Sequence, residues 1–530
     1  MVNGTRFIGV VFCLVGPLSL LQAQEQAFFH TSDQCIACHS GMVAQSGQDI
    51  SIGYTWRASM MANSARDPYW QAGVRREVMD HPGAQAAIED TCSTCHMPMA
   101  RFHATNSGTG MGTVFENLNS GNNLALDGVS CAVCHQIRSD NLGDESSFTG
   151  GFVIDTDQVL GERQIFGPHS VDIGRQAVMQ SAGQFIPTEG SHVQQSELCA
   201  TCHTLFTEAL NEAGEEVGLL PEQVPYHEWL QSEYQSTRSC QSCHMPELVE
   251  DAPISSVLGQ PRPAFSQHIF RGGNAFMLGL LNKYRGELGV TALPQELEAT
   301  VQSTKAFLST ETARVAIDSA EVSGDILELD VTIQSLSGHK LPTAYPSRRA
   351  WLYVRVHSQD GEAIFESGQL NPDGSITGND NDENGTSFEP HYTIIEHADQ
   401  VQIYESIIVD HRDRVTTGLL SGVSYIKDNR LLPRGFEKAN ASWEIAVHGN
   451  ALEDSDFIGG GDQVHYRIDL NGTDAAVTVS VQLMFQTIGY RWAENLRAYD
   501  APETNRFVGY YEDSAGDSAV TLASDTVVLE

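Results

Sequence analysis

CIACH at residues 35–39 is the first of five Cys-x-x-Cys-His pentapeptides, and these repeats decide how the first half of the chain folds. The others are CSTCH (92–96), CAVCH (131–135), CATCH (199–203) and CQSCH (240–244). Two thiols three positions apart can add to the two vinyl groups of one haem, and the adjoining histidine then ligates the iron. The repeats therefore predict five covalently bound haem c groups.

Each motif supplies two attachment cysteines and one proximal iron ligand. The predicted attachment residues are Cys35, Cys38, Cys92, Cys95, Cys131, Cys134, Cys199, Cys202, Cys240 and Cys243. The predicted proximal ligands are His39, His96, His135, His203 and His244. Zinc would draw on two cysteine pairs and leave one of five unmatched, and disulfides would not explain a histidine after every second cysteine. Haem is therefore the favoured interpretation.

The N-terminus has the pattern of a secretory signal peptide, predicted at residues 1–23. Arg6 is the only charged residue there, residues 7–21 are apolar, and Ala23 suits a cleavage site. Cys13 lies inside this segment, so every cysteine of the mature chain belongs to a haem motif. No later stretch reaches the ~18 apolar residues of a membrane span. We expect a soluble, exported protein, periplasmic or extracellular.

The chain is strongly acidic, with 68 Asp and Glu against 30 Lys and Arg and a net charge of −38 at pH 7. Such a surface repels nucleic acid and anionic lipid, and it steers basic partners in a salt-dependent way. A generally solvated acidic exterior explains the same charge, so charge alone identifies no partner. The partners we expect follow from the haems: redox partner proteins or a terminal electron acceptor.

The hydrophobic pattern predicts an α+β chain in two parts, a mostly helix and loop multihaem domain followed by an all-β, sandwich-like domain. The predicted boundaries are 24–273 for the pentahaem domain, 274–312 for a helical connector and 313–530 for the β-sandwich. Predicted helices cover 69–79, 228–234, 274–285 and 294–309, and predicted strands cover 326–333, 351–357, 401–409, 442–448, 464–470 and 476–488. Asp360-Gly361 and Asn471-Gly472 are predicted turns between strands.

A second axial ligand makes a haem a six-coordinate electron carrier, whereas a vacant position lets substrate reach the iron. Loop histidines, several of them beside glycine or proline, are the candidates, because a rigid backbone can hold such a side chain toward a haem. The candidate distal ligands are His81, His169, His192, His268 and His339, with His30, His103, His227 and the pair Met60-Met61 in reserve. An ordinary surface histidine is the alternative for each.

His339 is singled out because it lies in SGHKLP (337–342), between two predicted strands of the β half. As a distal ligand it would connect the β half to the haems. Arg348 and Arg349 follow, and their planar guanidinium groups suit bidentate contacts with haem propionates. A turn histidine followed by ordinary surface arginines is the other interpretation.

An acidic loop at residues 371–385 makes calcium a second candidate cofactor, since oxygen ligands between glycines can hold this ion. The loop contains Asp373, Asn379, Asp380, Asn381, Asp382 and Glu383. Its spacing does not match the helix-flanked calcium loop, and a solvated acidic loop is the alternative. Asp454, Asp456 and Asp462 form a second, weaker cluster.

Several stretches resemble the multihaem cytochromes built on the cytochrome c-554 type (c-552/4) haem domain, over roughly residues 30–250. They are WRASMMANSARDPYW (56–70), IEDTCSTCHMPM (88–99), DGVSCAVCH (127–135), SELCATCHTLFTE (196–208) and SCQSCHMP (239–246). The resemblance implies closely stacked haems with mostly bis-histidine ligation that pass electrons in series. SGHKLPTAYPSRRAWLYV (337–354) is similar to a C-terminal region found in a subset of exported multihaem proteins.

The leading functional hypothesis is an electron carrier with no catalytic residue of its own. The alternative is a multihaem reductase of a small nitrogen or sulfur oxyanion at one open-site haem. Pentahaem nitrite reductases are similar in length and haem count, but their catalytic motif usually ends in lysine, whereas all five motifs here end in histidine. A third hypothesis makes the β half a docking domain. Low-spin iron throughout would favour carriage, and a high-spin, ligand-binding haem would favour catalysis.

Changing Cys131 to Ala is expected to disrupt folding of the first half as well as removing one redox centre. The motifs are so closely spaced that porphyrin must replace much of the side-chain core before residue 245. Limited proteolysis and haem quantification of Cys131→Ala test this. A compact, protease-resistant protein with four haems would contradict it.

Overall fold

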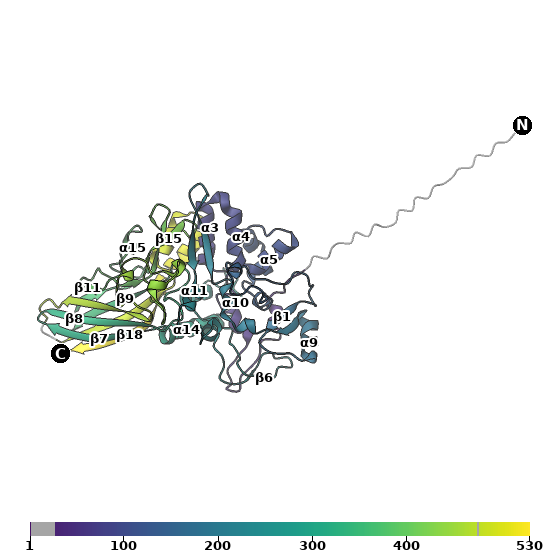
Figure 1. Cartoon of the computed structure of the whole chain (residues 1–530), viewed down its shortest axis with the longest axis horizontal. Coiled ribbons are helices and arrows are strands. Elements are labelled where there is room, and N and C mark those ends of the chain that lie inside the picture. Colours follow the sequence, from purple (N-terminus) through teal and green to yellow (C-terminus); the bar gives the residue numbers. More distant parts are fainter. Residues whose placement is uncertain (2–26, 474–475) are drawn as a thin grey trace.

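The computed structural model describes Met1 and residues 27–473 and 476–530, so residues 2–23 of the predicted signal peptide lie outside the described residues. Helices and loops make up most of the first half, and sheets dominate the second half, at the opposite end of the molecule (Figure 1). The predicted α+β class is confirmed. Across the described ranges, none of the helices combines the length and apolarity that a membrane crossing requires.

Short helices carry the five motifs. The helices of this half are α1 (Asp33–Ile36), α2 (Ile52–Arg57), α3 (Pro68–Asp80), α4 (Gln85–His96), α5 (Pro98–Ser107), α6 (Val114–Ser120), α7 (Asn123–Leu126), α8 (Cys131–Cys134), α9 (Ile173–Gly183), α10 (Ser196–Ala200), α11 (Pro225–Leu230) and α12 (Cys240–His244). The longest, α3, begins where the Asp67 carboxylate accepts hydrogen bonds from the Tyr69 and Trp70 amides and Pro68 occupies the first turn. It confirms the helix predicted at 69–79.

Three small sheets complete the first half. They are the parallel pair β1 (Gln164–Gly167) and β2 (Ile186–Glu189), the hairpin β3 (Leu205–Leu210) and β4 (Glu216–Gln223), and the short pair β5 (Ala252–Pro253) and β6 (Pro261–Arg262). Helices α13 (Ala275–Lys283) and α14 (Pro294–Glu311) then follow, as predicted for 274–285 and 294–309.

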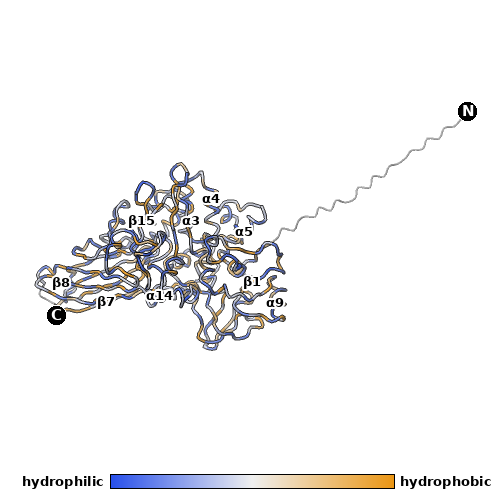
Figure 2. The backbone as a smooth tube through the Cα atoms, in the orientation of Figure 1, coloured by the Kyte–Doolittle hydropathy of each residue, from blue (hydrophilic) through white to orange (hydrophobic). Residues whose placement is uncertain are grey.

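Two facing sheets form the body of the second half. One has the order β10-β9-β17-β18, with β12 also paired to β9, and the other has the order β11-β16-β8-β7. Their strands are β7 (Ala313–Ser323), β8 (Ile326–Ser335), β9 (Arg349–Ser358), β10 (Ala363–Ser367), β11 (Ile394–Ile395), β12 (Ile403–Tyr404), β16 (Gly461–Asp469), β17 (Val477–Gln486) and β18 (Ala519–Leu529). Inward residues of β8 and β17 alternate with outward ones and fill one apolar core. Figure 2 shows the same alternation of hydropathy along the strands.

The strand prediction holds for most of this half and fails at one segment. Residues 442–448 form no strand: a short 3-10 helix occupies Trp443–Ile445, and only His448 makes a β-bridge, with Asp428. Its alternating pattern reflects Ile445 and Val447 packing into the core while the Trp443 side chain stays exposed. The segment at 401–409 splits into β12 and β13 (Ser406–Asp410).

Asn471-Gly472 lies in the connection from β16 to β17, two strands of different sheets, and both residues have positive φ angles, of 53° and 75°. The second turn, Asp360-Gly361, joins β9 to β10, with Gly361 at φ 83°.

The two halves share apolar cores. Helix α17 (Pro502–Glu512) packs against α3, and Phe507 lies 4.9 Å from the Tyr69 ring, centroid to centroid. A third sheet of the second half, β14-β13-β15 (β14 Val415–Thr416, β15 Gly422–Asp428), lies beside β4, where the Tyr425 hydroxyl donates to the Pro221 carbonyl at 2.8 Å. The predicted boundaries at 273 and 312 therefore stay proposals, because packing continues across them.

Candidate functional site

One cavity of about 1130 Å³ runs past all five motifs. Nine of the ten motif cysteines and all five motif histidines line it, Cys38 being the exception. All ten thiols are free, so none forms a disulfide. A continuous, largely apolar space edged by thiol pairs and imidazoles is the environment that covalent haem requires, and the donor set therefore fits that group.

Four motif histidines are held in one tautomer by the backbone. Their Nδ1 atoms lie 2.6–3.0 Å from carbonyl oxygens: His39 from Ile254, His96 from Ser64, His135 from Phe166 and His244 from Arg271. A carbonyl can only accept, so Nδ1 carries the proton and Nε2 keeps its lone pair. Burial lowers the pKa of His96 and of His244 to about 4, which leaves both imidazoles neutral at pH 7.

Two further histidines face motif histidines across the cavity. The ring centroids of His135 and His268 lie 6.2 Å apart at 21°, and those of His244 and His339 lie 6.2 Å apart at 9°. Two imidazole–metal bonds of about 2 Å plus two nitrogen-to-centroid distances of roughly 1 Å span about 6 Å. Each pair is therefore spaced as two axial ligands of one iron would be.

Both partner histidines have the same fixed tautomer. The Nδ1 atom of His268 lies 3.0 Å from the Ser266 carbonyl, and that of His339 lies 2.9 Å from the Lys340 carbonyl. Burial lowers the pKa of His268 to about 3 and also lowers the pKa of His339. Each of these imidazoles therefore keeps a free Nε2 lone pair, as an axial ligand must.

The remaining distal candidates separate into two groups. His169, Met60 and Met61 line the cavity, whereas His81, His192, His30, His103 and His227 do not. The Nε2 atom of His192 lies 2.9 Å from the Ile137 carbonyl, which fixes that nitrogen as a donor, and that of His81 lies 3.5 Å from the Ser421 hydroxyl. Neither residue lines the cavity, and the roles of His192 and His81 as distal ligands stay predictions.

The motifs are not arranged in the order of the sequence. Cys35 of the first motif is close enough to interact with Cys131 of the third, Cys95 of the second with Cys202 of the fourth, and Cys199 of the fourth with Cys240 of the fifth. Cys134 and Cys202 are also close enough to interact electrostatically. The spatial order is one, three, four and five, with the second motif beside the fourth.

Carboxylates and tyrosines, rather than imidazoles, line the cavity wall near Cys92. Glu222 is buried with the Thr207 hydroxyl 2.6 Å away, and Glu77 accepts from the Leu419 and Leu420 amides. Burial raises the pKa of Glu222 to about 7, and the pKa of Glu77 is also raised by burial. This wall differs chemically from the walls beside His135 and His244. No sequence motif points to Glu222, which lies between haem motifs on the hairpin strand β4.

The two arginines after His339 have different roles. Arg348 lines the cavity with only neutral oxygen partners, Thr343 O at 2.9 Å and Asn274 Oδ1 at 3.1 Å, and burial lowers its pKa to about 10. It is placed to meet an anion such as a propionate. Arg349 does not line the cavity, and its predicted contact with a propionate is wrong, because it forms a buried bidentate pair with Asp382 at 2.8 and 2.9 Å.

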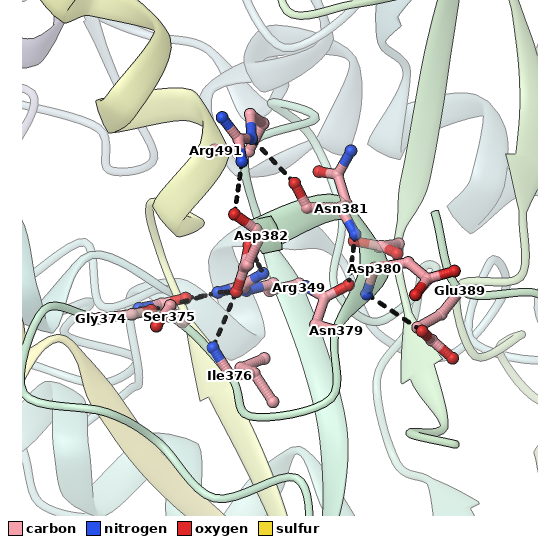
Figure 3. Close-up of polar contacts among 12 residues, drawn as sticks. Arg349, Gly374, Ser375, Ile376, Asn379, Asp380, Asn381, Asp382, Glu389 and Arg491 are labelled. Carbon is pink, nitrogen blue, oxygen red and sulfur yellow. Dashed lines mark hydrogen bonds and ion pairs between the residues drawn. The ribbon is translucent and has the colours of Figure 1, made fainter. Parts of the chain in front are cut away.

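Figure 3 shows the polar contacts that residues of the acidic loop make with Arg349, Glu389 and Arg491. Besides Arg349, Asp382 accepts from the Ile376 amide at 2.8 Å, and Arg491 donates to its carbonyl. The Asn379 side chain accepts from the Asn381 amide, and the Asp380 amide donates to Glu389. The Asp382 carboxylate is therefore already paired with the Arg349 guanidinium and the Ile376 amide inside the fold. Calcium binding by this loop stays a prediction.

A buried cluster of the second half contains Asp454 and Asp462 of the weaker predicted cation site, together with His391. The His391 Nε2 atom lies 3.0 Å from Asp454 and 3.9 Å from Asp462. The Gln402 and Asn429 amide groups both donate to Nδ1, because their oxygens are occupied by backbone amides. Nε2 must then carry the proton and donate to Asp454. This arrangement satisfies the histidine without a metal.

Comparison with known proteins yields one structural likeness. No protein-family model and no curated protein matches the chain. The solved structure of a penta-heme cytochrome c552 from Thermochromatium tepidum is similar, with a TM-score of 0.53 and 15% sequence identity, over 95% of this chain and 100% of that chain. At this identity the likeness shows that the two chains share a fold.

Replacing Asp382 by Ala should lower the free energy of unfolding by about 3–5 kcal/mol, because it leaves the Arg349 guanidinium buried without its partner. Both side chains are at most 4% exposed. Asp140→Ala is the matched control, since its pair with Arg138 is exposed to solvent and its loss should change the stability little. Denaturant unfolding compares the two, and equal losses would contradict the assignment.

Proposed function

We propose that this protein is an exported multihaem c-type cytochrome that relays electrons between redox partners. The five motifs would attach five haem c groups, with His39, His96, His135, His203 and His244 as proximal ligands. The observation that supports this proposal best is the presence of two pairs of facing imidazoles, His135 with His268 and His244 with His339. The shared fold with a penta-heme cytochrome supports the same assignment.

The chain's own residues would set up the relay in three ways. Backbone carbonyls fix the imidazole tautomers, so each Nε2 presents its lone pair without rearrangement. The proximity of neighbouring motifs would bring the attached haems side by side in the order one, three, four and five, with the second beside the fourth. Bound haem iron supplies the one-electron chemistry. Arg348 offers a buried positive charge near His203 and His339.

His268→Ala and His339→Ala should each turn one low-spin haem high-spin while all five haems remain attached. The reason is that each change removes one Nε2 lone pair from a pre-formed imidazole pair. Electron paramagnetic resonance of the oxidised proteins measures the change. His339→Met should instead stay low-spin with a raised reduction potential.

His192→Ala is the control, because its Nε2 atom donates to the Ile137 carbonyl and should leave the spin states unchanged. Five low-spin haems in both His268→Ala and His339→Ala would refute the ligand assignment.

The wall beside Cys92 favours a second function, reduction of a small nitrogen or sulfur oxyanion at an open haem. Among the described residues, the only non-motif imidazoles on the cavity wall are His169, His268 and His339, and two of these face the third and fifth motifs. Glu222, whose burial raises its pKa to about 7, can donate a proton near neutral pH. Reduction of an oxyanion consumes protons, so buried carboxyl groups suit it.

Under this second function, the oxidised protein should contain a high-spin haem that binds cyanide or hydroxylamine. Glu222→Gln should then slow reduction of nitrite about 10²-fold, through loss of the proton donor. Glu89→Gln is the matched control, since Glu89 is buried and close to Cys92 but binds the Val114 amide and does not line the cavity. Absence of any high-spin haem would exclude this function and favour carriage alone.

A further inference from the structure

The loop that carries His339 comes from the second half of the chain, between β8 and β9, yet a carboxylate of the first half holds it. Glu228, on α11, is fully buried. Its Oε2 atom accepts hydrogen bonds from the Lys340 amide at 3.1 Å and from the Thr343 hydroxyl at 2.5 Å. Both donors lie within four residues of His339, so this one carboxylate fixes the loop on the C-terminal side of the imidazole.

Glu228 also completes a buried network of four charges. Arg430 lies 3.1 Å from Glu228 Oε1 and binds Asp428 through two hydrogen bonds of 2.8 Å. The Lys340 ammonium lies 2.6 Å from Asp428 Oδ2, an oxygen that Arg430 also binds. The four side chains are at most 7% exposed. Two cations and two anions balance, so the network is neutral only while Glu228 is ionised.

The network reaches the His339 ring through the backbone of Lys340. The Lys340 carbonyl is the acceptor for His339 Nδ1 at 2.9 Å, and the Lys340 amide is the donor to Glu228. Leu341 adds two backbone hydrogen bonds with Leu431, of 2.8 and 2.9 Å. The residue that sets the imidazole's tautomer is therefore anchored on both of its peptide groups.

We infer that Glu228 is a positioning residue that holds His339 at the fifth haem from across the boundary between the two halves. This role rests on the proposed function, in which His339 is a distal ligand. Glu228 orients the ligand loop, and its negative charge, close enough to act on His339, favours the oxidised state of that haem. Removing the charge should raise the reduction potential of this one centre.

Glu228→Gln tests the inference, because glutamine keeps the shape but cannot neutralise Arg430. The expected result is a full complement of five haems, with one midpoint potential raised and one low-spin resonance signal altered. Glu405→Gln is the matched control: Glu405 forms a buried pair with Lys427 at 2.9 Å and does not line the cavity. It should leave all five potentials unchanged. Redox titration followed optically and by electron paramagnetic resonance gives both readouts.

Potentials and resonance signals identical to the parent would overturn the inference, as would equal changes in Glu405→Gln. If Glu228→Gln does not fold, Thr343→Val removes one contact while keeping the charge, and should alter the same resonance signal. An unaltered signal there also overturns the inference. His339→Ala distinguishes failure of the ligand assignment from failure of the positioning role. Five low-spin haems in this variant would overturn the assignment of His339 as a ligand. A high-spin haem in His339→Ala with an unchanged Glu228→Gln protein would overturn only the positioning role.

Discussion

The hydrogen bond from an imidazole Nδ1 to a backbone carbonyl is the interaction on which this site depends. It occurs at four motif histidines and at His268 and His339. Each bond leaves one nitrogen free and aims the ring into the cavity. The four motif imidazoles are held by carbonyls that lie 27 to 215 residues away in the chain, so the loops and short helices of the first half are tied together at these histidines.

The second half contributes to the site as well as packing beside it. His339 and Arg348 both come from the connection between β8 and β9, and both line the cavity of the first half. The charges buried with this connection are all paired: Lys340, Asp428 and Arg430 of the second half form one network with Glu228 of the first half, and removing one partner would leave another charge buried alone. A sandwich that supplied only a docking surface would not need such contacts.

The same cavity has two chemically different walls. Near His135 and His244, second imidazoles complete pairs suited to six-coordinate iron. Near Cys92, buried carboxylates and tyrosines take their place, and burial raises the pKa of Glu222 to about 7. Under the proposed function the imidazole pairs suit a carrier, whereas the buried carboxyl groups beside Cys92 suit a reductase. Measuring spin states decides between them.

The sequence by itself determined the five motifs, the change from helical to alternating periodicity at residue 312, and His268 and His339 as candidates. These depend on covalent spacing and local backbone, which short segments encode. Only the tertiary structure places His81 beside Ser421 and His192 against the Ile137 carbonyl, pairs Arg349 with Asp382, and joins Glu228 to the His339 loop. Those outcomes depend on contacts between residues as many as 340 positions apart, which no local pattern records.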